Sequence, residues 1–74
     1  MAIDVTRYVH QLDNGRWIVA YEDEKTGQWY APMTEDEQRL TGCHTYFAGS
    51  IERLNCTSYA TRRTAVNRAC KIFG

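Results

Sequence analysis

The sequence predicts an α+β fold: a small antiparallel sheet of three to four strands, with a short surface helix and a C-terminal amphipathic helix packed on one face. Two patterns carry this prediction. The pair Asn14-Gly15 separates two runs of alternating polar and apolar residues, as in a β-hairpin. Residues 61–73 repeat apolar side chains at the spacing of an α-helix. A chain of 74 residues holds one domain, and we expect it to span 1–74.

The hairpin is expected in the segment YVHQLDNGRWIVAY, residues 8–21. With Asn14 and Gly15 as a two-residue loop, counting outward places Leu12 opposite Trp17. The same register pairs His10 with Val19 and Tyr8 with Tyr21. One face would carry Tyr8, His10, Leu12, Trp17, Val19 and Tyr21, and the other Arg7, Val9, Gln11, Ile18, Ala20 and Glu22. Either the C-terminal helix covers the face with the smaller side chains, or the aromatic face forms the core.

A third strand is expected after the hairpin, in meander order. Residues 24–27 (Glu-Lys-Thr-Gly) are typical of a type I turn that ends with Gly27 in the left-handed region. Trp29 and Tyr30 would lie on the returning strand. Pro32 should end this strand or mark a sheet edge, because proline donates no hydrogen bond to a ladder.

A short surface helix follows. Thr34 and Glu37 have the spacing of a capping box, Gly42 is a natural stop, and Leu40 is the only large apolar residue between them. The pattern of residues 43–59 leaves two alternatives open. This segment forms either a fourth strand or a short helix after Ser50 that is followed by a turn at 55–56.

The C-terminal helix is expected to begin after Thr61 as its N-cap. Its apolar residues form one stripe that faces the core: Ala65, Val66, Ala69, Cys70, Ile72 and Phe73. The opposite face carries Arg63, Asn67 and Lys71, flanked by Thr64 and Arg68.

Charge is unevenly distributed along the chain. Residues 1–52 carry four Lys/Arg and nine Asp/Glu, whereas residues 53–74 carry five Lys/Arg and no acid. Arg62 and Arg63 lie in the first helical turn, where the helix dipole disfavours positive charge. We therefore expect either the acids of 22–24 or 35–37, or the negative surface of a partner, to lie against this pair.

The sequence offers little for catalysis or metal binding, so we expect a non-enzyme without cofactor or metal. Its three cysteines lack the CxxC spacing of a zinc site and are expected to be free thiols. Cys43 and His44 are adjacent, and neighbouring side chains usually point apart. No apolar run is long enough to cross a membrane, and the N-terminus lacks the pattern of a signal peptide. We expect a cytoplasmic protein.

Two binding functions remain. The first is a protein-binding regulator that uses aromatic anchors and a segregated basic surface. Its expected partner-binding residues are Tyr8, Trp17, Tyr21, Trp29, Arg62, Arg63, Arg68 and Lys71. The alternative is a small DNA- or RNA-binding domain that uses the basic C-terminal helix. For that alternative, residues 51–70 loosely resemble a helix-turn-helix.

The hairpin and the last helix also resemble a broad group of small, uncharacterised bacterial and phage domains. In these, an NG-x-W-x-V hairpin precedes a helix of the form T-x-x-x-A-x-x-x-A. The corresponding residues here are Asn14, Gly15, Trp17, Val19, Thr61, Ala65 and Ala69. By analogy with this class, the resemblance implies a phage-type regulator that docks on a host machine, such as RNA polymerase or a defence effector.

Overall fold

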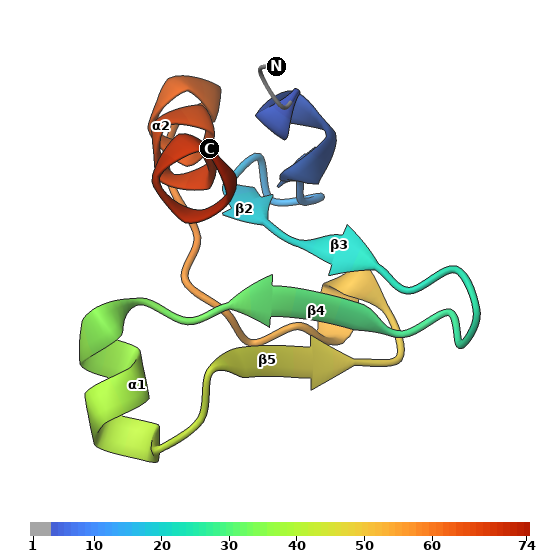
Figure 1. The fold of residues 1–74 in the computed structure, drawn as a ribbon. Helices are drawn as coiled ribbons and strands as arrows, with labels where there is room; N and C mark the ends of the chain where they lie inside the picture. The colour runs from blue at the N-terminus through green and yellow to red at the C-terminus, as the bar shows by residue number, and fades with distance from the viewer. Residues whose placement is uncertain (1–3) are drawn as a thin grey trace.

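The computed structural model describes residues 4–74 and confirms the α+β class (Figure 1). One antiparallel sheet pairs β1 with β2, and the other has the order β3-β4-β5. The elements are η1 (Val5–Tyr8), β1 (Val9–Gln11), β2 (Trp17–Val19), β3 (Tyr21–Glu22), β4 (Trp29–Pro32), α1 (Glu35–Thr41), β5 (Thr45–Ala48), η2 (Ile51–Arg53) and α2 (Arg62–Phe73). None of the helices in this part of the chain has the length and apolar content needed to cross a bilayer.

The expected register of the first hairpin is wrong by one residue. Gly15 lies at φ +85°, but Asn14 does not adopt positive φ, which excludes the two-residue loop with both residues left-handed. The Leu12 N–H instead donates to the Arg16 carbonyl at 2.7 Å, which leaves a three-residue loop, 13–15. The strands consequently pair Val9 with Val19, His10 with Ile18 and Gln11 with Trp17.

The shifted register changes which side chains share a face. Val9 and Val19 now lie on one face of the hairpin, and Ile18 lies on the other. Tyr8 is not on a strand, because it ends the 3-10 helix η1. Its carbonyl accepts from the Ala20 N–H at 2.8 Å, so Tyr8 pairs with Ala20 rather than with Tyr21.

Both faces of the hairpin are buried, each in its own cluster. On one face α2 packs Ala65 and Ala69, which are fully buried, against Val5 and Val19. On the other face Ile18 and Ala20 meet Ala31 of β4 and Leu54. The alternative in which the C-terminal helix covers a face with Val9, Ile18 and Ala20 is therefore wrong, because the register separates Val9 from the other two.

The meander continues with an interruption at Ala20, between β2 and β3. Gly27 closes the next turn at φ +73°, and Pro32 is the last residue of β4, as predicted. Both alternatives for residues 43–59 occur in succession, β5 first and then the single turn η2. The helix-turn-helix hypothesis is wrong, because residue Tyr59 forms a β-bridge with Trp17 instead of lying in a second helix.

Both α-helices begin at the N-cap that the sequence predicted, and α1 ends at its predicted stop. Thr34 and Glu37 form a full capping box, and Gly42 ends α1 at φ +72°. The Thr61 side chain accepts from the Thr64 N–H and starts α2. The predicted apolar stripe is wrong at one residue. Cys70 is exposed, because the contact of α2 with the hairpin runs along Ala65 and Ala69.

Candidate functional site

A row of aromatic side chains crosses the molecule from the end of α2 to the edge of the β3-β4-β5 sheet. Phe73 stacks on Tyr8, with ring centroids 4.1 Å apart, and Tyr8 meets Tyr21 edge-on at 6.3 Å. Tyr21 stacks on Tyr30 at 5.7 Å, and Tyr30 lies 6.4 Å from Phe47. We call these five residues the aromatic row.

The strand register explains the outer part of the row. Tyr21, Tyr30 and Phe47 are directly opposite one another on β3, β4 and β5, so their side chains share one face. The intervening residues Ala31 and Tyr46 point to the other face and join the second core cluster. In Figure 1, η2 and the segment after it lie behind this sheet, and no described helix lies in front of it.

The aromatic row becomes more exposed toward β5. Tyr21 and Tyr30 are half-buried, whereas Phe47 is 69% exposed. Leu40 on α1 is the other large exposed apolar residue of the described chain. Exposed aromatic side chains that lie in contact with one another are a common feature of interaction surfaces.

A small cavity of about 210 Å³ adjoins the row beside Tyr8 and Tyr21. Its other lining residues are Arg7, His10, Glu22, Glu24 and Trp29. His10 meets the Trp29 ring edge-on at 5.1 Å. Burial lowers the pKa of His10 below its ordinary value, and a hydrogen bond with the backbone of Ala20 only partly offsets this. The cavity therefore carries charges of both signs around a neutral imidazole.

The structure brings together only some of the expected partner-binding residues. Tyr8 and Tyr21 lie in contact within the row. Trp17 packs half-buried against the first core cluster and Trp29 against the second, so the two tryptophans lie in different clusters. The four cations all lie on α2, where Arg62, Arg63 and Lys71 are exposed and Arg68 is half-buried.

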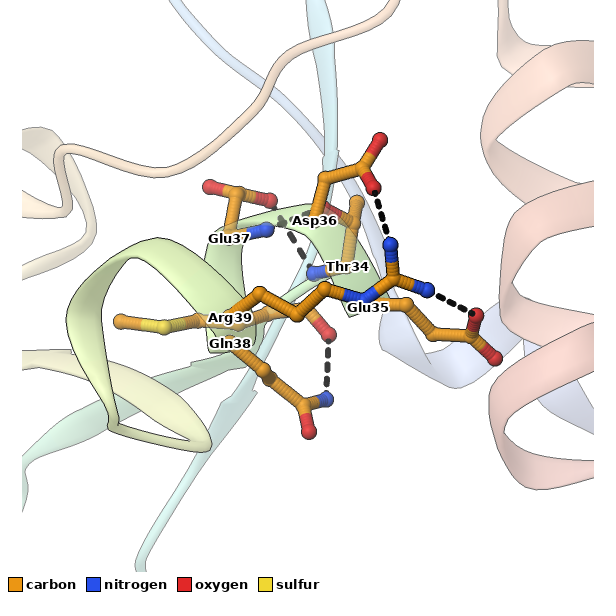
Figure 2. A network of polar contacts seen from close by, with 7 residues as sticks. Thr34, Glu35, Asp36, Glu37, Gln38 and Arg39 are labelled. Atoms are coloured by element: carbon orange, nitrogen blue, oxygen red, sulfur yellow. Dashed lines mark hydrogen bonds and ion pairs between the residues drawn. The ribbon is translucent and has the colours of Figure 1, made fainter.

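The acids of 22–24 and 35–37 do not pair with Arg62 or Arg63 anywhere in residues 4–74. Arg39 instead forms ion pairs with Glu35 at 3.9 Å and with Asp36 at 3.6 Å, both within α1 (Figure 2). Arg62 influences a different acid, Asp4, whose pKa is lowered first by hydrogen bonds from Thr6 and, to a smaller degree, by nearby arginines. The expectation of an intramolecular acidic partner from either triplet is therefore wrong.

Arg68 and Lys71 line a larger cavity, of about 560 Å³, between α2 and the start of α1. Glu35 and Asp36 lie on its opposite wall, and Met33 and Ile72 contribute apolar surface. This cavity has cations on one side and acids on the other, so it does not present a single sign of charge to a ligand.

Glu37 joins three segments at the other side of α1. Its carboxylate accepts from the Thr34 N–H at 3.1 Å, from the Thr57 hydroxyl at 3.0 Å and from the Tyr46 hydroxyl. Partial burial acts to raise the pKa of Glu37, but the hydrogen bonds with Thr34 and Thr57 and the charge of Arg68 outweigh it, so the pKa lies below its ordinary value. This network holds α1 against β5 and the segment before α2.

The described residues contain no group of three His, Cys, Asp or Glu side chains placed to hold a metal ion. Cys43 and Cys70 are exposed thiols, and burial raises the pKa of the half-buried Cys56 thiol. The ionisable residues thus form structural contacts and mixed surfaces, and the aromatic row is the most organised exposed feature.

Sequence reasoning missed Tyr30, Phe47 and Phe73 as members of a surface. The signal was present for Tyr30 and Phe47, because alternation along β4 and β5 places both on the face opposite the core. Using that alternation requires the boundaries of β5, and the sequence pattern did not define them. Comparison of the chain with protein-family models, with curated proteins and with solved structures gave no significant match.

Proposed function

We propose that this protein is a non-enzymatic protein-binding domain that docks on a macromolecular partner through the aromatic row. The observation that carries the proposal is the in-register alignment of Tyr21, Tyr30 and Phe47 on one sheet face, which the end of α2 reaches at Tyr21 and which is open at Phe47. Aromatic anchors of this kind dominate the affinity of protein interfaces, because they remove much apolar area from water at a small cost in side-chain entropy.

The geometry of the rings favours a protein over a nucleic acid at this surface. A base-stacking platform needs open ring faces beside a groove of positive charge. Here the rings of Tyr21 and Tyr30 stack on each other with an offset, at 24° and with centroids 5.7 Å apart, so part of each ring face is already occupied. The nearest charges have both signs, with Arg7 opposed by Glu22 and Glu24. Phosphate groups would gain little attraction there.

The class of partner follows from the resemblance to small phage-type domains. On that analogy the proposed role is a regulator of phage or mobile-element type that acts on a host nucleic-acid machine, for example RNA polymerase or a defence effector. Support for a binding role also comes from α2, whose last turn carries the exposed Lys71 and ends at Phe73 of the aromatic row. Charged surfaces beside apolar anchors raise association rates and fix orientation.

Affinity capture from a lysate of the bacterial host tests this proposal, with purified partner titrated afterwards by calorimetry. Tyr30→Ala and Phe47→Ala should each weaken binding about 10-fold or more, as expected for interface anchors. Leu40→Ala is the matched control, because Leu40 is equally apolar and 87% exposed but lies on α1. If a captured protein binds both row variants as tightly as the wild type, the aromatic row is not the docking surface.

Nucleic acid binding through α2 is the second candidate function. Its support is that Arg62, Arg63 and Lys71 are exposed and form no salt bridge within the described chain. A gel-shift titration at about 50 and 200 mM salt tests it, because phosphate contacts weaken steeply with salt. Salt-sensitive binding that Arg62→Glu with Arg63→Glu abolishes would establish this function. Absence of binding at the lower salt concentration would exclude it.

A further inference from the structure

Strand β5 ends the three-stranded sheet and has a free edge. It pairs only with β4, and in Figure 1 no other described element runs along its outer side. The Met33 N–H donates to the His44 carbonyl at 2.9 Å, so these two residues form a hydrogen-bonded pair. Because such pairs alternate along an antiparallel ladder, Tyr46 and Ala48 turn their backbone groups toward β4. Thr45 and Phe47 therefore turn their N–H and C=O groups outward.

The hydrogen bonds between β3 and β4 lead independently to the same alternation of inward and outward backbone groups. The Asp23 N–H donates to the Gln28 carbonyl at 2.8 Å, which makes Tyr21 and Tyr30 the next bonded pair. Tyr30 thus turns its backbone groups toward β3 and away from β5, in agreement with the outward orientation of its neighbour Phe47. Pro32, which has no N–H to donate, stands opposite Thr45 at a position where β4 makes no bond to β5.

The edge of β5 lacks the usual protection against pairing with another strand. Sheet edges are commonly blocked by lysine, by proline or by a bulge. Residues 43–51 (CHTYFAGSI) contain no proline and no Asp, Glu, Lys or Arg. The edge at β1 differs, because the Val9 N–H already donates to the Thr6 carbonyl. The outer groups of β5 are thus the most accessible strand-pairing site of the described chain.

We infer that the occupant of this edge is a second copy of the chain, which pairs β5 with β5 in antiparallel orientation. Identical copies carry identical charges, so a charged edge would repel itself, whereas a neutral edge does not. An antiparallel pair of equal strands has two-fold symmetry and closes as a dimer, leaving no free edge at that side. The result is one continuous six-stranded sheet.

Dimerisation would join the two aromatic rows, because Phe47 is the outermost member of each row and its neighbour is the incoming strand. The inference goes beyond the proposed function and does not depend on it. The edge is defined by backbone groups of Thr45 and Phe47, whereas the docking surface also contains Tyr21 and Tyr30, which lie away from the edge.

Residue-resolved amide exchange by NMR tests the inference on the intact protein. We expect a weak dimer, populated at roughly 10–500 μM, because a short strand pair must offset the loss of translational and rotational freedom. The amides of Thr45 and Phe47 should exchange fast in dilute protein and at least 5-fold more slowly at high concentration. The amides of Tyr46 and Ala48 should be protected at both concentrations. Concentration-independent exchange at Thr45 and Phe47 would overturn the inference.

Sedimentation equilibrium of three variants gives a second readout. Thr45→Pro removes an outward donor at the first residue of the strand, where the β4 ladder loses no bond, and Phe47→Lys places a charge at the edge. Both should remain monomeric at concentrations that dimerise the wild type, a shift of at least 10-fold in dissociation constant. Leu40→Lys should dimerise normally. Equal loss in Leu40→Lys would mean nonspecific association of apolar surface and would also overturn the inference. Failure here leaves the Tyr30→Ala test of docking unaffected.

Discussion

Glu37→Ala should destabilise the fold more than any other substitution of an acid. The carboxylate accepts hydrogen bonds from Thr34, Thr57 and Tyr46, and it thereby joins α1 to β5 and to the segment before α2. Each such bond contributes a net free energy of about 0.5–1.5 kcal/mol, so losing three costs about 1.5–4.5 kcal/mol. A domain of this size has a free energy of unfolding of roughly 4–11 kcal/mol in total, so the loss is a large fraction.

Thermal unfolding followed by circular dichroism measures the effect. For a domain of 60–100 residues each kcal/mol lowers Tm by about 4–8 °C, so Glu37→Ala should lower Tm by roughly 6–36 °C. Glu35→Ala is the matched control on the same helical turn. Glu35 is exposed and its one ion pair, with Arg39, is 3.9 Å long, so its loss should cost about 0.5 kcal/mol or less. Similar shifts for the two variants would refute the network.

The same carboxylate predicts an acid-sensitive stability. The pKa of Glu37 is lower in the folded protein than its ordinary value of 4.5, so the unfolded chain binds the proton more tightly. The contribution of Glu37 is therefore complete above about pH 4.5 and is lost as pH falls through the folded-state pKa. Glu37→Gln should flatten this part of the stability profile, whereas Glu35→Gln should not. An unchanged slope in Glu37→Gln would show that the carboxylate charge is not used.

Three further outcomes are expected. Gly15→Ala should lower the free energy of unfolding, measured by urea titration, by about 1–2 kcal/mol, because Gly15 lies at φ +85°. Gly49→Ala is the control: Gly49 has an ordinary φ and equally open space around it, so the free energy of unfolding should not change. Ala69→Leu should lower the free energy of unfolding by about 1–3 kcal/mol, because the larger side chain overpacks the contact between α2 and the hairpin. Cys70→Leu, on the exposed side of α2, should change it little. Equal losses of stability in the two variants would contradict this packing. The depressed pKa of His10 means that the unfolded chain binds its proton more tightly, so stability should decline as pH falls below about 6.5, and His10→Gln should remove that decline.

The sequence predicted the elements whose signals are local. The capping box of Thr34 and Glu37, the left-handed Gly42 and the Thr61 cap depend on residues within one turn of each other, and all three are present. Prediction of the hairpin register was wrong, because one dipeptide is compatible with loops of two or three residues. The choice depends on whether Asn14 adopts positive φ, and in the structure it does not.

The candidate site was harder to predict because it depends on pairing between distant strands. Tyr21, Tyr30 and Phe47 come from three strands, and only their register aligns them. Trp17 and Trp29 were the most conspicuous aromatic residues of the sequence, but alternation turns each toward a core cluster. Large aromatic residues report burial as often as binding, so composition alone does not separate the two.

One feature of this small domain costs stability that the described chain does not recover. Arg62 and Arg63 oppose the dipole at the start of α2, and neither forms a salt bridge within residues 4–74. A 74-residue domain buries only about 60% of its unfolded surface and has little stability in reserve. Reversing one of these charges should therefore stabilise the isolated protein, and we expect Arg63→Glu to do so by about 0.3–1 kcal/mol. A variant that is more stable alone but binds its partner less well is the result expected of a surface retained for binding. Unchanged binding by the stabilised variant would show that the arginine pair has no part in docking.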